Sequence, residues 1–199
     1  MSVFPTIKDA TPINDISGLK LNIATKEQLD QAEAQNIAKV VLKYLTRKPS
    51  KRSALFDMQW ILRLHQQMFD DVWEWAGVIR NTPPPNIGVQ AYQIREELGK
   101  LIGDLHYWEN LSMDLDEQAV RLHHRAVLIH PFANGNGRWS RMLGDIWLKR
   151  HGRKFPTWPS GINQEESPVR VEYIQAVKKA DNGNFDDLLE LHKRFIPAE

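Results

Sequence analysis

Apolar side chains recur every three or four residues along most of this chain, the spacing that places them on one face of an α-helix. Leu55, Met58 and Ile61 show this spacing in one stretch, and Thr25 with Gln28 three residues later has the signature of a helix N-terminus in another. The pattern predicts seven helices, over residues 25–45, 54–70, 95–108, 116–129, 135–148, 168–180 and 185–195.

A different pattern separates the second and third predicted helices. Gly77, three consecutive prolines at 83–85 and Gly88 exclude a helix there, because proline lacks the backbone donor and glycine costs backbone entropy. Residues 78–80 and 87–89 contain β-branched side chains, and we expect them to form the two strands of a hairpin. The predicted fold is therefore an all-α domain with one small β-hairpin.

Composition excludes several classes of function. Among the 199 residues, 26 Lys and Arg nearly balance 25 Asp and Glu, so no overall positive field attracts nucleic acid. The absence of cysteine excludes disulfides, zinc thiolates and a cysteine nucleophile. No apolar run approaches the roughly 18 residues of a membrane span. We expect residues 1–24, which lack a signal-peptide pattern, to form an extended arm before one domain at 25–199, in the cytoplasm.

Groups suited to phosphate chemistry are concentrated in residues 130–141, HPFANGNGRWSR. His130 ends one predicted helix and is a base that titrates near pH 7. The next helix begins within the glycine turn, where free N–H groups and the positive end of the helix dipole can hold a phosphate. Gly135 and Gly137 let a ligand approach the backbone closely.

Three further side chains add to this run. Arg138 and Arg141 are three residues apart and can hold different phosphates of one nucleotide. The Asn134 oxygen can bind Mg²⁺ directly or through water. Each feature also has a plainer interpretation: the glycines only cap two helices, and the histidine is a packed core or surface residue. The basic run 47–52 is interpreted as a solvated loop, with nucleic-acid contact as the alternative.

The pattern HPFxxGNGRxxR resembles the signature of Fic-domain proteins of the Fic/Doc superfamily. Eight positions are specified, so a chance match in a chain of this length is rare. Further similarity to Fic proteins lies at residues 61–65, 75–80, His123 and 170–176. The resemblance covers about residues 25–195. Within it, the start Glu33-x-x-Asn36-Ile37 resembles the small bacterial group named mobile mystery protein B.

The resemblance implies a mostly helical protein adenylyltransferase, which moves AMP from ATP to a Tyr, Ser or Thr hydroxyl of a target protein. In that role His130 would be the general base, which takes the proton from the target hydroxyl. The alternative implied by the same fold is a transferase that uses another donor, such as one carrying UMP, GMP or phosphocholine. A second alternative is a non-catalytic binding protein that retains the Fic fold.

The same resemblance assigns the nucleotide contacts. Asn136 and the N–H groups of Gly135 and Gly137 would hold the α- and β-phosphates of ATP. Arg138 would hold the β-phosphate and Arg141 the γ-phosphate, with Mg²⁺ bridging the α- and β-phosphates.

One position departs from the pattern of many AMP-transferring members, which have Asp or Glu where this chain has Asn134. An amide oxygen brings no charge, so we expect weaker metal binding, and this residue alone favours a non-catalytic protein. Gly137 stands where Doc-type kinases have lysine, which argues against phosphate transfer.

The expected hairpin occupies the place of the Fic flap. There, the strand edge formed by Ile87, Gly88 and Val89 would pair with a segment of the target and present its hydroxyl. A rigid surface loop is the alternative interpretation, which the three prolines fit equally well.

Many Fic proteins are held inactive by a helix whose glutamate pairs with the second motif arginine. The nearest candidate inhibitory residue is Glu33, although Leu29 and Ala34 stand where that helix has Ser/Thr and Gly/Asn. We interpret Glu33 as a solvated or structural residue, with pairing to Arg141 as the alternative. Because the inhibitory pattern is incomplete, a separate antitoxin-like partner is expected beside the target protein, as in toxin–antitoxin pairs. A homo-oligomer stays open, and no membrane or direct nucleic-acid partner is expected.

Overall fold

The computed structural model describes residues 16–84, 87–164 and 167–198. Within these ranges each of the seven predicted helices is present, so the all-α fold is confirmed. Two 3₁₀ turns precede α3 and α6: η1 (Ala91–Gln93) and η2 (Ser160–Asn163). The helices are α1 (Lys26–Tyr44), α2 (Met58–Phe69), α3 (Ile94–Asn110), α4 (Leu115–Ile129), α5 (Asn136–Arg150), α6 (Pro168–Ala180) and α7 (Asp186–Arg194).

Side-chain caps determine where the first two helices begin. Thr25 and Gln28 form the predicted capping box of α1, in which each side chain accepts the other's backbone N–H at 3.3 Å. α2 begins at Met58, four residues later than predicted, because Phe56 has a left-handed backbone (φ 55°) and Asp57 caps the N–H of Trp60 at 2.7 Å.

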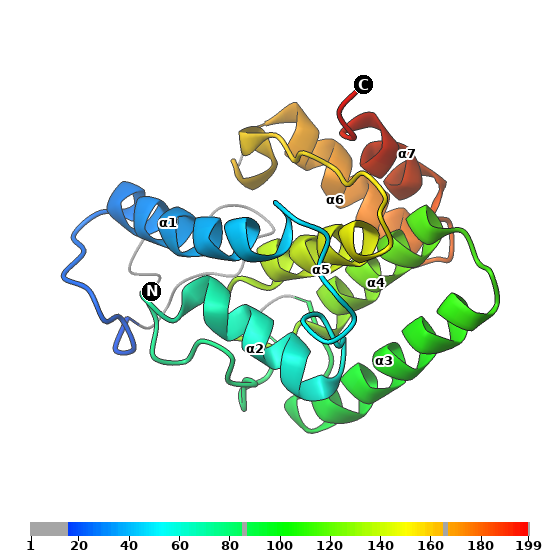
Figure 1. The fold of residues 1–199 in the computed structure, drawn as a ribbon. Coiled ribbons are helices and arrows are strands. Elements are labelled where there is room, and N and C mark those ends of the chain that lie inside the picture. Colours follow the sequence, from blue (N-terminus) through cyan, green and yellow to red (C-terminus); the bar gives the residue numbers. More distant parts are fainter. Residues whose placement is uncertain (1–15, 85–86, 165–166, 199) are drawn as a thin grey trace.

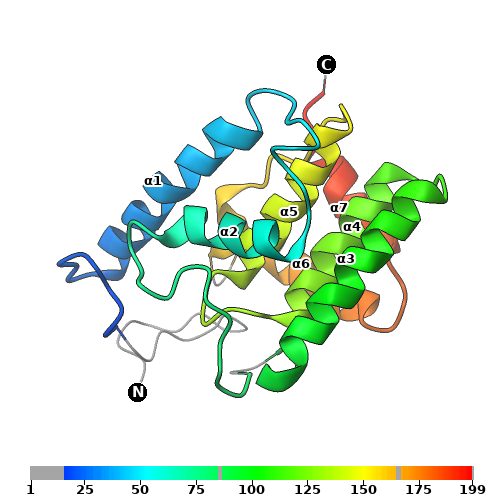
Figure 2. The same cartoon turned by 60° about the horizontal axis from the view of Figure 1, so that its bottom comes forward.

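α4 and α5 occupy the centre of the molecule and pack side by side (Figure 1). α1 packs against α2, which also contacts α5, whereas α6 and α7 pack together on the other side, where α7 contacts α4. α3 runs along α4 (Figure 2). The loop 130–135 joins the two central helices.

Two hydrophobic clusters hold these helices together. The larger one is shared by α1 to α5, and its largest fully buried side chains are Trp73, Trp139, Trp147, Phe56, Phe69 and Phe132. The smaller one joins α4 and η2 to α6 and α7, through Val120, Ile162, Tyr173, Ala176, Ala180, Leu188 and Leu191. Burial of each large apolar side chain contributes roughly 2–3 kcal/mol, and the larger cluster, which includes Phe132, fixes the central loop.

The expected hairpin is not built from regular strands in the part of the chain that the structure describes, where the one β-bridge joins Leu19 and Trp73. Instead, the two extended segments bind the loop around His130. Arg80 N–H donates to Pro131 O (2.9 Å) and Val89 N–H donates to Ile129 O (3.3 Å). The sequence pattern did not indicate this pairing because the acceptors lie 40 residues or more away along the chain.

The predicted N-terminal arm lies largely outside the described residues. Its described part docks on the segment after α2, where Lys20 N–H donates to Val72 O at 2.9 Å and Glu74 N–H donates to Gly18 O at 2.8 Å. Across the residues placed by the structure, no helix is long and apolar enough to cross a bilayer.

Candidate active site

His130 lies at the point where α4 ends and the loop begins. It is the C-cap of α4 with a left-handed backbone (φ 52°), and its side chain is 6% exposed. Burial lowers the pKa of the imidazole to about 4, the backbone carbonyl of Val127 opposes this shift, and the charge of Arg80 adds to it. His130 is therefore neutral at pH 7 and can accept a proton, as a general base must.

Arg80 ties this histidine to the extended segments beside it. Its Nε donates to His130 O at 2.7 Å, Nη1 donates to Thr82 O at 2.6 Å, and Nη2 donates to Val89 O. Gly88 lies directly against the histidine, since a Cβ there would be 2.9 Å from His130 Cβ. The structure thus brings the predicted flap residues and the predicted base together.

The loop itself is closed by Asn136. Its Oδ1 accepts from Phe132 N–H (2.9 Å) and its Nδ2 donates to Phe132 O (2.8 Å), while the Phe132 ring is fully buried. The Asn136 side chain is therefore engaged within the loop, and the contact of Asn136 with a phosphate stays a prediction for its backbone N–H. Gly135 N–H is also engaged, by Asn134 Oδ1 at 2.6 Å. The first-turn N–H groups of 136–138 remain, since intrahelical bonding begins when Trp139 N–H donates to Gly135 O.

His65 on α2 holds the loop by a hydrogen bond to its backbone. Its Nδ1 accepts from Gly77 N–H (2.9 Å), so Nε2 carries the proton and donates to Asn134 O (3.0 Å). Burial lowers the pKa of His65 to about 3, which keeps it neutral, and its ring stacks on Phe132 with 3.6 Å between centroids. Only glycine fits at 135, where φ is 77° and a Cβ would be 2.6 Å from the Phe69 ring.

Arg138 is paired with a carboxylate. Its Nη1 lies 2.6 Å from Oε2 of Glu33, and its guanidinium lies over the Phe69 ring. The other carboxylate oxygen of Glu33 accepts from Trp73 Nε1 at 2.7 Å, and Glu33 is 3% exposed. Glu33 is therefore not solvated and does not pair with Arg141, whereas its burial and its two partners agree with the interpretation as a structural residue. Leu29, one turn earlier, is fully buried, so the helix face that carries Glu33 is packed inward.

Arg141 has quite different surroundings. It is 6% exposed, and its Nη2 donates to Asn163 Oδ1 of η2 at 2.8 Å. Its guanidinium lies 5.5 Å from the ring centroid of Tyr173 and 5.9 Å from that of Trp158. No carboxylate forms an ion pair with it among the residues placed by the structure. The two arginines therefore leave the same turn of α5 toward opposite parts of the chain.

Comparison with known proteins agrees with this geometry. Residues 55–148, from just before α2 to near the end of α5, match the model of the Fic/DOC family. These residues, 55–148, form a Fic/DOC domain.

Relatives of this Fic/DOC domain have names that refer to nucleotide transfer. The chain is 29% identical over 135 residues to the protein adenylyltransferase fic-1 of Caenorhabditis briggsae, which covers 60% of this chain and 25% of that protein. It is 36% identical over 75 residues to the uridine 5'-monophosphate transferase of Xanthomonas campestris pv. campestris. This alignment covers 35% of this chain and 13% of that protein. The chain thus matches about a quarter or less of these relatives.

Solved structures share the fold. A Fic-1 fragment from Caenorhabditis elegans superposes with a TM-score of 0.70 at 24% identity, over 86% of this chain and 50% of that one. The N-terminal Fic domain of a Bartonella quintana protein, solved with bound ADP, superposes with a TM-score of 0.66 at 21% identity, over 96% of this chain and 94% of that one.

The Fic/DOC domain has few groups that could hold a metal by themselves. In the described ranges, no group of three or more His, Cys, Asp and Glu side chains is placed to bind an ion. Asn134 offers a neutral oxygen, which the Gly135 N–H already approaches at 2.6 Å. Mg²⁺ usually keeps one or two carboxylates and substrate phosphates as ligands, so these residues fit an ion that arrives with a nucleotide better than a resident one.

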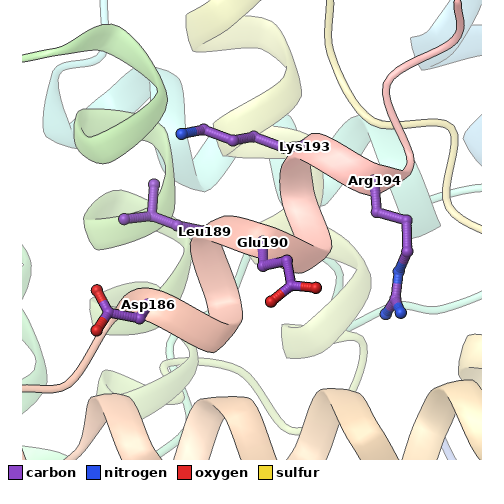
Figure 3. Close-up of a pocket in the computed structure, with 5 residues that line it drawn as sticks. All are labelled: Asp186, Leu189, Glu190, Lys193 and Arg194. Carbon is purple, nitrogen blue, oxygen red and sulfur yellow. The ribbon is translucent and has the colours of Figure 1, made fainter.

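An open hollow lies elsewhere, outside the matched residues 55–148. It has a volume of about 640 Å³ along α7, and five side chains of this helix line it: Asp186, Leu189, Glu190, Lys193 and Arg194 (Figure 3). None of them belongs to the loop 130–135 or to the helix turn that follows it. Near the loop, Arg138 is paired with Glu33, and Arg141 contacts Asn163 and Tyr173.

Proposed function

We propose that this chain is a protein adenylyltransferase, which moves AMP from ATP to a Tyr, Ser or Thr hydroxyl of a target protein. One observation carries the proposal: a neutral, buried His130 stands in the same short loop as the first N–H groups of α5, with Arg138 and Arg141 on the next turn. The adenylyltransferase names among the relatives and the ADP in the Bartonella quintana structure support it.

In this proposal His130 takes the proton of the target hydroxyl as its oxygen attacks the α-phosphorus of ATP. The new P–O bond joins AMP to the target, and the bond to the β-phosphate oxygen breaks, so that pyrophosphate leaves. A base of this kind contributes roughly 10²–10⁴ in rate. The left-handed backbone of His130 and the bond from Arg80 hold the ring in place before the target arrives.

The phosphates would lie on the N-terminal end of α5. The N–H groups of residues 136–138 and the helix dipole would hold the α- and β-phosphates, with Arg138 on the β-phosphate and Arg141 on the γ-phosphate. Mg²⁺ would come with ATP as part of the substrate, and Asn134 would offer it one neutral oxygen. Charge neutralisation of the leaving pyrophosphate then comes mainly from the two arginines.

The target would pair with the segment of Ile87, Gly88 and Val89. Both backbone groups of Val89 face inward, to Ile129 O and to Arg80, so they are not available to a target. Gly88 has a φ of 130°, outside a regular strand, and its backbone is the part of the segment that we expect to meet the target. The closeness of Gly88 to His130 would place the target hydroxyl beside the base.

Glu33 is the proposed internal inhibitor, acting on Arg138. A phosphate that binds Arg138 must displace a carboxylate that is 2.6 Å away and anchored by Trp73. The isosteric Glu33→Gln removes the charge but keeps the hydrogen-bonding shape, so labelling should rise. Unchanged labelling would remove Glu33 from this role.

A different donor is the second candidate. The described contacts involve the phosphate-binding turn and not a nucleoside base, and one relative is a uridine 5'-monophosphate transferase. Labelling with ATP, GTP, UTP and CDP-choline side by side separates the donors. Strongest labelling by a donor other than ATP would replace AMP in the proposal.

The decisive test is incubation with labelled ATP and Mg²⁺ in a host lysate. The wild-type chain should label a protein band, and His130→Ala should reduce labelling by about 10² or more. His106→Ala is the matched control, because this histidine on α3 is 45% exposed and its Nδ1 lies 3.8 Å from Glu109 Oε2, away from the loop 130–135. Equal labelling by wild type and His130→Ala would reject His130 as the base. Absence of labelling from every donor would favour the non-catalytic alternative.

The wider setting completes the proposal. We assign residues 25–199 to one Fic domain, because α6 and α7 share a hydrophobic cluster with α4. Within the family we assign the chain to the bacterial mobile mystery protein B group, and we place it in the cytoplasm. A separate antitoxin-like protein would add to the control by Glu33, and the chain would be able to form a homo-oligomer. Size-exclusion chromatography with light scattering tests the homo-oligomer, and co-purification from the native host tests the separate partner.

A further inference from the structure

Arg141 is held by a group of buried side chains that its motif does not include. Arg141, Tyr173, His123 and His192 come from α5, α6, α4 and α7, and each is 6% exposed or less. Tyr173 Oη lies 2.9 Å from His123 Nε2, and His123 Nδ1 lies 2.9 Å from His192 Nε2. The oxygen of Tyr173 also interacts with the Arg141 guanidinium. These contacts form a chain from the C-terminal helix to the arginine.

The direction of this chain follows from a count of donors. A hydroxyl proton directed at the Arg141 cation would be repelled, so the Tyr173 proton goes to His123 Nε2, the acceptor 2.9 Å away. His123 then carries its proton on Nδ1 and donates to His192 Nε2. In this arrangement one group stays unsatisfied, His192 Nδ1, which has no partner among the described residues. The reverse direction leaves two groups unsatisfied, the Tyr173 hydroxyl proton and His192 Nδ1, and is therefore more costly.

The same group leaves the charge of Arg141 uncompensated. Burial lowers the pKa of His192 to about 3 and that of His123 well below its usual range, so both rings are neutral at pH 7. Asn163, which accepts from Arg141 at 2.8 Å, is neutral as well. Burial also raises the pKa of Asp145, one turn further along α5, to about 8. The surroundings fix the guanidinium without providing a counter-ion.

We propose that Tyr173 and His123, anchored by His192, are positioning residues that hold the Arg141 guanidinium ready for the terminal phosphate of a nucleoside triphosphate. The assignment of this phosphate to a nucleoside triphosphate rests on the proposed function. The direction of the hydrogen-bond chain is independent of that function. A phosphate that reaches Arg141 supplies the missing counter-charge, whereas one that reaches Arg138 must first displace Glu33.

Titration calorimetry with ATP and with ADP tests the positioning role. Tyr173→Phe removes the hydroxyl and keeps the ring, so it should weaken ATP binding by roughly 3- to 10-fold and leave ADP binding unchanged. Tyr44→Phe is the matched control, because Tyr44 is also buried and bonds through its hydroxyl, to Gln67 Oε1 at 3.3 Å. This control should change neither affinity. An equal loss for both nucleotides with Tyr173→Phe, or no loss, would overturn the role.

The histidine tautomers provide a second test on the unmodified protein. In ¹⁵N-labelled wild type, nuclear magnetic resonance should find the proton of His123 on Nδ1 and a bare Nε2, and His192 should carry its proton on Nδ1. A His123 ring protonated on Nε2 would overturn the chain. This measurement needs no nucleotide, so it remains decisive if the proposed transfer fails. A wild type with equal affinity for ATP and ADP would instead overturn the γ-phosphate assignment and leave the tautomer result standing.

Discussion

The two motif arginines share one helix turn but have opposite surroundings. Arg138 is about a quarter exposed and lies 2.6 Å from Glu33, a carboxylate that α1 brings from 105 residues away. Arg141 is buried and meets an amide oxygen and two aromatic rings from the C-terminal part of the chain. One cation is already neutralised, and the other is fixed but uncompensated.

This difference separates two tasks that a phosphate site must perform. A cation held by neutral groups is ready to bind an anion, because little has to be displaced. A cation paired with a carboxylate binds an anion only when the pair opens, and this makes the site controllable. Under the proposed function, the comparison thus assigns binding strength to the α6–α7 side of the site and control to the α1 side.

The largest expected effect tests whether Arg141 is truly uncompensated. Burial raises the pKa of Asp145 from 3.8 to about 8, although Trp158 and Arg141 oppose the shift. The folded protein therefore keeps a proton that the unfolded chain loses above pH 4, and stability falls as pH rises from about 4 to 8. Asp145→Asn removes this penalty and should stabilise the protein by about 2–4 kcal/mol at pH 7, with little difference near pH 4.

Urea unfolding of Asp145→Asn and wild type at pH 4.5, 6 and 7.5 gives the measurement. Ser140→Ala, a substitution at a buried polar residue on the same helix that does not titrate, is the control and should show no pH-dependent difference. A loss of stability for Asp145→Asn at pH 7.5 would mean that Asp145 is ionised and pairs with Arg141. In that case both arginines would be neutralised and the comparison would fail.

The sequence predicted the helices and the loop but not the partners of the arginines. Helical periodicity and the Thr25–Gln28 capping box depend on residues a few positions apart, and these predictions are confirmed. Glu33, Asn163 and Tyr173 reach the site only because helices distant in the sequence pack together. Their roles leave no local pattern, and for this reason the sequence did not indicate that Glu33 pairs with Arg138.

His65 and Arg80 are two further supports that sequence reasoning did not identify. Each lies in a segment that resembled Fic proteins, and this was the available signal. His65 donates to the backbone carbonyl of Asn134, and Arg80 donates to that of His130. A bond to a backbone carbonyl does not depend on which residue provides the carbonyl, so no sequence motif indicates it. The predicted hairpin strands do not form for a related reason. Arg80 N–H and Val89 N–H donate to carbonyls of Pro131 and Ile129 and not to each other's segment.

A second prediction concerns the stability of the α1 side. Arg138→Gln leaves Glu33, which is 3% exposed, without its cation. Removal of one partner of a buried pair is costly, and after a reduction for the partly exposed arginine we expect a loss of about 2 kcal/mol. The double variant Glu33→Gln/Arg138→Gln should recover at least half of it. Thermal unfolding measures both, with about 2–4 °C per kcal/mol for a domain of this size.

Arg121→Gln is the control for that comparison, because Arg121 forms a more exposed pair with Glu117 at 2.7 Å. This substitution should lower the free energy of unfolding by at most about 1 kcal/mol. If the double variant is no more stable than Arg138→Gln alone, Glu33 and Arg138 are not coupled. The α1 side would then not be the controlled side of the site.

The smallest expected effect compares what the two partners do to activity. Glu33→Gln frees Arg138 and should raise labelling about tenfold, which corresponds to roughly 1.4 kcal/mol. Asn163→Leu removes the oxygen that holds Arg141 and should lower labelling about threefold, through the KM for ATP and not through kcat. Initial rates over a range of ATP concentrations measure both changes. Effects of the same sign would contradict the division of the site into a controlled arginine and a prepared one, because both partners would then act alike.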